Sequence, residues 1–165
     1  MNDTPERTTT TTTTTAAVPI DIASYMSQIP FARLLGFELV KFGDGASEIL
    51  YTPTPEHFNT FDVAHGGACM TLLDISMAAA ARSDTPEFGV VTIEMKTSFM
   101  RPSLGALRGV GRLMHRTATL AFVEASILDE KDQLCAHATG TFKYVKRRLP
   151  TGPASANAQR LPSTD

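Results

Sequence analysis

The sequence predicts an α+β domain in which one antiparallel sheet curls around a single long helix. Residues 66–82 are apolar almost all round and contain no proline, which is typical of a helix wrapped by other structure. A hairpin signal precedes this helix, and four stretches with strand character follow it from residue 88 onward. With 165 residues and 42% apolar composition, the chain is long enough for one domain with a substantial core.

The first elements are expected before residue 52. Apolar side chains in 21–35 fall near helical spacing and predict one short helix, which Pro30 should break or kink. Two brief strands, 37–42 and 46–51, are separated by a Gly-Asp-Gly sequence at 43–45 that suits positive φ. These residues predict a β-hairpin.

The later strands follow the long helix. Along 91–99, Val, Ile, Met, Thr and Phe alternate with Thr, Glu, Lys and Ser, which predicts a strand with two different faces. Three further strands are expected over 107–116, 120–128 and 134–145. Their short links predict that these strands are antiparallel neighbours.

The two ends of the chain have no apolar periodicity. We expect a disordered Thr-rich tail over 1–19 and a second flexible tail, rich in Pro, Ala and Ser, over 148–165. The folded domain is therefore expected over 20–147.

Composition excludes several classes of function. The formal net charge is -2 and no block of Lys or Arg rises above the background, so binding to nucleic acid is not expected. Cys69 and Cys135 lack neighbours at ligand spacing, so we expect reduced, packed thiols and no metal site. No signal segment opens the chain and its most apolar stretch is interrupted by Asp74, which favours a cytoplasmic protein without membrane contact.

Asp74 is the first residue whose position in the sequence needs a functional explanation. A carboxylate in the middle of an otherwise apolar helix costs several kcal/mol unless it is paired or hydrated. The structural alternative is an Asp that is partly exposed or bonded to a neighbouring strand, and on this helix alone the two interpretations are about even.

A second feature lies where the long helix begins. The sequence His65-Gly66-Gly67 places two residues without side chains on the first turn, which leaves backbone N–H groups approachable at the positive end of the helix dipole. Such a terminus suits an oxyanion. Alternatively, the glycines permit tight packing and His65 is a satisfied structural histidine.

The helix geometry separates the two features. At about 1.5 Å and 100° per residue, Asp74 lies about 13 Å along the helix and half a turn around from His65. One copy of the helix cannot place both groups on one carbonyl carbon. If they act together, a second subunit must supply the carboxylate through an isologous contact.

The segment Asn59-x5-His65-Gly66-Gly67-x6-Asp74 resembles the PaaI-like branch of the hotdog-fold thioesterases, in the 4-hydroxybenzoyl-CoA thioesterase superfamily. The resemblance extends over nearly the whole domain. Further similar stretches are Val91-Thr92-Ile93-Glu94, Phe99-x-Arg101-Pro102 and Ala138-Thr139-Gly140-Thr141-Phe142.

This resemblance implies a role for each residue of the motif. The Gly66 N–H would polarise the thioester carbonyl, Gly67 would keep the turn open, and Asn59 and His65 would shape the pocket. Asp74 of the opposite subunit would act as general base or nucleophile. Thr92, on the following strand, would position water or the carboxylate.

The resemblance also implies the assembly and the reaction. A hotdog dimer, paired again into a homotetramer, would hydrolyse an aryl, arylacetyl or medium-chain acyl-CoA without any cofactor, since coenzyme A is part of the substrate. A hotdog-fold hydratase acting on an enoyl or hydroxyacyl thioester and a non-catalytic acyl-CoA sensor are the alternatives.

Two further expectations concern the surroundings of the site. Met70, Met77 and the alanines at 78–81 are expected to pack in the core, with a substrate channel as the alternative, since the acyl chain must lie against something apolar nearby. Cationic candidates for the CoA phosphates are Arg101, Arg116, Lys143 and Lys146, although a solvated charge is the alternative for each of them.

Overall fold

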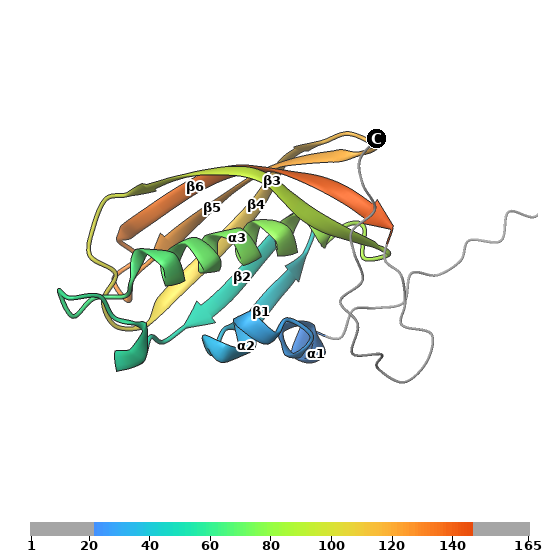
Figure 1. Ribbon diagram of the computed structural model, residues 1–165. Coiled ribbons are helices and arrows are strands. Elements are labelled where there is room, and N and C mark those ends of the chain that lie inside the picture. The colour runs from blue at the N-terminus through green and yellow to red at the C-terminus, as the bar shows by residue number, and fades with distance from the viewer. Residues whose placement is uncertain (1–21, 147–165) are drawn as a thin grey trace, which may run out of the picture.

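The computed structural model describes residues 22–146 (Figure 1). The two predicted tails, 1–19 and 148–165, lie outside the described residues. Within the described part, no helix is long and apolar enough to cross a membrane. The cytoplasmic location stays a prediction.

Two short helices occupy the segment where one was expected. These are α1 (Ile22–Ser27) and α2 (Pro30–Leu34). Pro30 stands at the first position of α2, where its missing N–H is not needed, and Ile29 before it is extended with ψ 95°. The expectation of a single helix was therefore wrong, because Pro30 ends one helix and begins another.

Six strands form one antiparallel sheet in the order β1-β2-β4-β5-β6-β3. The predicted hairpin and the antiparallel neighbours β4, β5 and β6 are confirmed. β3 does not pair with the next strand in the chain but crosses over to β6, and so forms one edge of the sheet. The strands are β1 (Glu38–Gly43), β2 (Ala46–Tyr51), β3 (Phe88–Phe99), β4 (Leu107–Arg116), β5 (Leu120–Leu128) and β6 (Leu134–Lys146).

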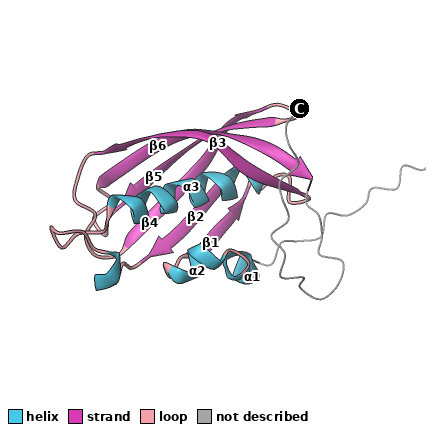
Figure 2. Cartoon of the chain, in the orientation of Figure 1, coloured by secondary structure: helices cyan, strands magenta, loops and turns pink. Residues whose placement is uncertain are grey.

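The long helix α3 (Gly66–Arg82) begins and ends at the predicted residues and lies across the inner face of the curled sheet (Figure 2). Leu72, Leu73 and Met77 are fully buried between helix and sheet. This is the predicted α+β arrangement, with the helix wrapped by the strands on one side.

The helix approaches the sheet most closely at Ser76. A Cβ added at Gly111 of β4 would lie 2.3 Å from the Ser76 carbonyl oxygen, and one added at Gly109 would lie 2.5 Å from its Oγ. The Ser47 hydroxyl donates a hydrogen bond of 2.7 Å to the same carbonyl. Two glycines therefore fix how deeply α3 sits in the sheet.

One flank of α3 and the neighbouring edge of the sheet stay uncovered. Met70 is 40% exposed on the helix, whereas Ile93 and Phe99 on β3 are 55% and 52% exposed. Burial of Met70 in the core was wrongly expected, because it lies on the flank of the helix that the sheet does not reach. Unpaired strand edges with apolar side chains favour association with another chain.

Candidate active site

A tightly folded loop delivers the start of α3. The Asn59 N–H donates to the Val63 carbonyl at 2.9 Å, and the Asn59 side-chain Oδ1 accepts the Phe61 N–H at 2.8 Å. The His65 N–H then donates to the His57 carbonyl at 2.8 Å. Asn59 therefore fixes the loop that positions His65, which is a supporting role.

His65 caps the helix. Its Nδ1 accepts the Gly67 N–H at 2.9 Å, so a neutral imidazole carries its hydrogen on Nε2. A Cβ added at Gly67 would lie only 3.1 Å from that Nδ1. Gly67 is thus explained by the cap, because any side chain would press on the ring that satisfies its N–H.

Gly66 is explained differently. Its N–H makes no hydrogen bond within the described residues, although it lies on the first turn of a 17-residue helix. A Cβ added there would meet only the Phe99 ring, at an ordinary contact distance of 3.6 Å. Packing does not require glycine at this position, and the helix start presents an unused donor at its positive end.

Asp74 is partly buried and bonded to the sheet. The Thr92 hydroxyl of β3 donates to Asp74 Oδ1 at 2.8 Å. Burial raises the pKa of the Asp74 carboxyl, and the bond from Thr92 partly offsets that rise in pKa by favouring the ionised form. The structure thus joins two of the residues predicted for the site and leaves the second carboxylate oxygen without a protein donor in the described chain.

A β-bulge brings Thr92 to the helix. The pairing of β3 with β6 shifts between Thr92 and Glu94, so that Ile93 is an extra residue. Strict alternation would place Thr92 and Phe99 on opposite faces, since they are an odd number of residues apart. With the bulge, Thr92 pairs with Phe142 and Phe99 with Ala136, both buried on the inner face. The predicted uniform alternation was wrong at this point.

The two halves of the predicted site do not meet within one subunit. Gly66 lies beside Phe99, near the end of β3, whereas Asp74 lies beside Thr92. Eight residues of helix separate Gly66 from Asp74 by about 12 Å. Two groups this far apart on one helix can act on the same carbonyl carbon only if a second subunit supplies one of them, as the sequence predicts.

The four candidate phosphate-binding cations divide between the two ends of β3. Arg101 follows the strand, and its guanidinium donates to the Leu134 carbonyl at 2.8 Å. Lys143 and Lys146 pair with Val91 and Phe88 near the other end. Arg116 stacks at that end too, 5.8 Å above the Tyr144 ring.

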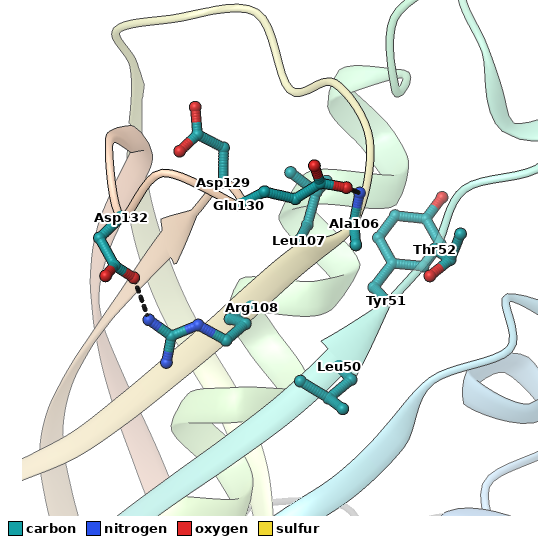
Figure 3. A pocket seen from close by; sticks show the side chains of 9 residues that line it. All are labelled: Leu50, Tyr51, Thr52, Ala106, Leu107, Arg108, Asp129, Glu130 and Asp132. Atoms are coloured by element: carbon teal, nitrogen blue, oxygen red, sulfur yellow. Dashed lines mark hydrogen bonds and ion pairs between the residues drawn. The ribbon is translucent and has the colours of Figure 1, made fainter.

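A pocket of about 350 Å³ lies elsewhere, at the start of β4 (Figure 3). Its rim carries Asp129, Glu130 and Asp132, whose charge would repel phosphate groups. Arg108 is held there by ion pairs to Glu48 and Asp132. The pocket contains none of the residues predicted for the site. Its lining is Leu50, Tyr51, Thr52, Ala106, Leu107, Arg108, Asp129, Glu130 and Asp132.

Sequence reasoning missed the neighbours of the helix start. Sequence places Phe99 in the 91–99 strand and in a stretch similar to the family but gives it no role at the site, yet its ring is the side chain that a Cβ at Gly66 would touch. The bulge at Ile93 has no signature in the apolar pattern. The spacing of Gly66 and Met70, four residues apart on one helix, is the signal that could have placed Met70 beside the donor.

One antiparallel sheet curled around a long central helix is the predicted hotdog arrangement. The family model described as "Thioesterase superfamily" matches residues 61–136. The chain belongs to the thioesterase superfamily, and the resemblance to its PaaI-like members is confirmed.

Three relatives illustrate this membership. The conserved protein PA5202 from Pseudomonas aeruginosa is 32% identical with a TM-score of 0.67, over 70% of this chain and 93% of that one. A phenylacetic acid degradation-related protein from Ralstonia eutropha JMP134 is 26% identical with a TM-score of 0.65, over 70% and 89%. The protein named "Putative esterase Ta0293" from Thermoplasma acidophilum is 25% identical, over 77% of this chain and 96% of its own.

Proposed function

We propose that this chain is an acyl-CoA thioesterase whose active site is shared between two subunits. The observation that carries the proposal is an unused backbone donor, the Gly66 N–H, on the same uncovered flank of α3 as a partly buried carboxylate, Asp74. Hydrolysis of a thioester needs both groups, because a nucleophile attacks carbon while negative charge develops on oxygen.

The free edge of β3 supports the dimer. If two copies pair their β3 edges antiparallel about a two-fold axis, the Phe99 end of one strand lies beside the Thr92 end of the other. Gly66 touches the first end and Asp74 the second, so each Gly66 comes next to the Asp74 of the partner subunit. Apolar side chains at this edge, Val91 and Ile93 among them, would lose their exposure to water.

In this arrangement the Gly66 N–H and the partner's Asp74 have different tasks in the reaction. The Gly66 N–H stabilises the oxygen on which charge develops, while the free oxygen of the partner's Asp74 either takes a proton from the attacking water or attacks the carbonyl carbon itself. If water attacks, the C–S bond then breaks and the CoA thiolate takes the proton that Asp74 removed from the water, so that it leaves as the thiol. If Asp74 attacks, breaking the C–S bond leaves a mixed anhydride on Asp74, which water hydrolyses to the free acid, and the proton released in that hydrolysis neutralises the thiolate. Thr92 keeps the carboxylate fixed by holding its other oxygen.

The same two-fold arrangement gathers the candidate cations. Arg101 follows the Phe99 end of β3, and this end lies beside the Val91 end of the partner's strand, where Lys143, Lys146 and Arg116 are found. We propose that these residues from both subunits hold the CoA phosphates. An aryl, arylacetyl or medium-chain acyl group is proposed for the other part of the substrate, and a tetramer of two such dimers is proposed for the assembly.

The first experiment is release of CoA thiol, followed with a chromogenic disulfide, from benzoyl-, phenylacetyl- and hexanoyl-CoA. We expect turnover by the wild type and a loss of about 10²- to 10⁴-fold in Asp74→Ala, the range for losing a positioned base. Binding of acyl-CoA without any thiol release would favour a sensor, and release of water from a hydroxyacyl thioester would favour a hydratase.

The second experiment tests whether the site is shared. Asp74→Ala and Gly66→Pro subunits, each inactive alone, are co-expressed with different tags, and mixed dimers are purified through both tags. A shared site restores one intact copy, formed by Gly66 of the first subunit and Asp74 of the second. If the mixed dimer stays inactive while wild-type subunits treated in the same way are active, the site does not span two subunits.

A further inference from the structure

The Phe99 ring stands at the start of α3 in an unusual setting for an inner-face aromatic residue. It pairs with buried Ala136 on β6, yet it is 52% exposed. Its Cζ lies 3.6 Å from where a Cβ of Gly66 would be. The ring therefore stands at van der Waals distance from the first turn of the helix, beside the unused Gly66 N–H.

Met70 faces the same place from the helix itself. It follows Gly66 by four residues, so the two share one face, and long helical side chains lean back toward the helix N-terminus. The Met70 side chain therefore leans over the turn that contains Gly66 and Gly67. It is 40% exposed, so the described part of the chain leaves much of it open. Two large apolar side chains thus border the two glycines that begin the helix.

We infer that Phe99 and Met70 select the acyl group by limiting the width of the substrate at the carbon next to the thioester carbonyl. This inference rests on the proposed function, because the Gly66 N–H locates the carbonyl. A hydrogen-bonded carbonyl oxygen lies about 2.9 Å from the donor nitrogen. The acyl C2 atom is bonded to the carbonyl carbon, so it also lies close to the surface of the first helix turn. The Phe99 ring already lies at contact distance from that surface, which leaves room for a straight or flat acyl group but not for a branch at C2.

Butyryl-CoA and isobutyryl-CoA test this inference because they have the same atoms and differ only in branching at C2. We expect the wild type to prefer butyryl-CoA by at least about 10-fold in kcat/KM, the lower end of the discrimination that one methyl group gives in an apolar site. Phe99→Ala and Met70→Ala should each bring the two kcat/KM values together, with the gain confined to isobutyryl-CoA.

Matched controls distinguish this effect from a general loss of apolar surface. Phe122, 36% exposed on β5, and Met114, 45% exposed near the far end of β4, are changed to Ala in the same way. Both controls should keep the wild-type preference. Phe99→Leu, which keeps apolar volume at the edge of the sheet, replaces Phe99→Ala if circular dichroism shows that the alanine variant is unfolded.

Three outcomes would overturn the inference. They are a wild type that does not discriminate between the two substrates, a preference that is unchanged in both site variants, and dissociation of the dimer by Phe99→Ala, which would make the ring an interface residue. If the wild type releases no thiol at all, the proposed function fails separately. Calorimetric binding of butyryl- and isobutyryl-CoA to wild type and Phe99→Ala then decides the inference, and equal affinity ratios in the two proteins refute it.

Discussion

Replacing Gly66 by proline removes one hydrogen-bond donor and leaves the helix start in place. Gly66 is the first residue of α3, the position at which proline is best tolerated because its missing N–H is not needed there. His65 before it already has φ -60° and ψ 139°, which is the conformation that a following proline favours. The Gly66 N–H makes no hydrogen bond within the described chain, so no bond of the fold is lost.

The expected effects on stability and rate therefore differ in sign. Proline restricts the unfolded chain, and a substitution that fits its site raises the free energy of unfolding by about 0.4 to 1 kcal/mol. Loss of an oxyanion donor lowers kcat by about 10²- to 10³-fold, which corresponds to about 2.7 to 4 kcal/mol in the activation free energy. A variant that is at least as stable as wild type and nearly inactive is the expected result.

Thermal unfolding and thiol release on the same preparations measure both effects. Gly66→Ala is the matched control, because it adds a Cβ that meets Phe99 at 3.6 Å but keeps the N–H. If Gly66→Pro keeps kcat within a few-fold of Gly66→Ala, the Gly66 N–H is not the oxyanion donor. If both variants lose activity equally, the added carbon rather than the missing hydrogen is responsible.

Four further predictions concern Asp74 and the packing beneath it. Because burial raises the pKa of Asp74, its ionisation lowers stability as pH rises above the ordinary Asp range, so Asp74→Asn should melt higher than wild type at pH 7 and equally below that range. Thr92→Val should move the acid limb of kcat/KM to higher pH, whereas Thr92→Ser should not, because only valine removes the donor that lowers the pKa of Asp74. Gly111→Ala should lower the free energy of unfolding by about 3 kcal/mol, since its Cβ would lie 2.3 Å from a helix carbonyl, as denaturant titration would show. In the same titration Ser76→Ala should be as stable as wild type or up to about 1 kcal/mol more stable, because its buried hydroxyl has no partner in the described chain.

Local sequence signals predicted most of the fold. The bounds of α3 follow from a long apolar run that ends at Arg82, and the β1–β2 hairpin follows from residues that accept positive φ, with Asp44 at 54° and Gly45 at 68°. The position of β3 beside β6 could not be predicted, because pairing between strands that are distant in the chain depends on how the whole sheet closes around the helix. The predicted break at Pro30 is confirmed, but the second helix that Pro30 begins has no apolar signal separate from that of the first.

The candidate site could be predicted in part. Asp74 is a charged residue in an apolar helix, and the glycines at the helix start have low helix propensity, so these residues can be picked out in a single sequence. The contact between Thr92 and Asp74 came from family resemblance, because strict alternation would have placed Thr92 on the same face as Glu94 and away from Phe99. The bulge that reverses this face depends on the backbone pairing of β3 with β6, which side-chain polarity does not reveal.

Two glycines show why a residue that is unfavourable in a regular element cannot be assigned a function from the sequence alone. Gly111 and Gly66 both stand in regular elements where alanine would be favoured by propensity. A side chain at Gly111 would meet a helix carbonyl at 2.3 Å, so packing alone requires glycine there. A side chain at Gly66 would meet nothing closer than 3.6 Å, and the N–H beside it has no partner in the described chain. The fold does not require Gly66 to be glycine, and the bare backbone with its unused N–H leaves room for a group from outside the subunit; a thioester oxygen brought up beside the partner's Asp74 is a group of that kind.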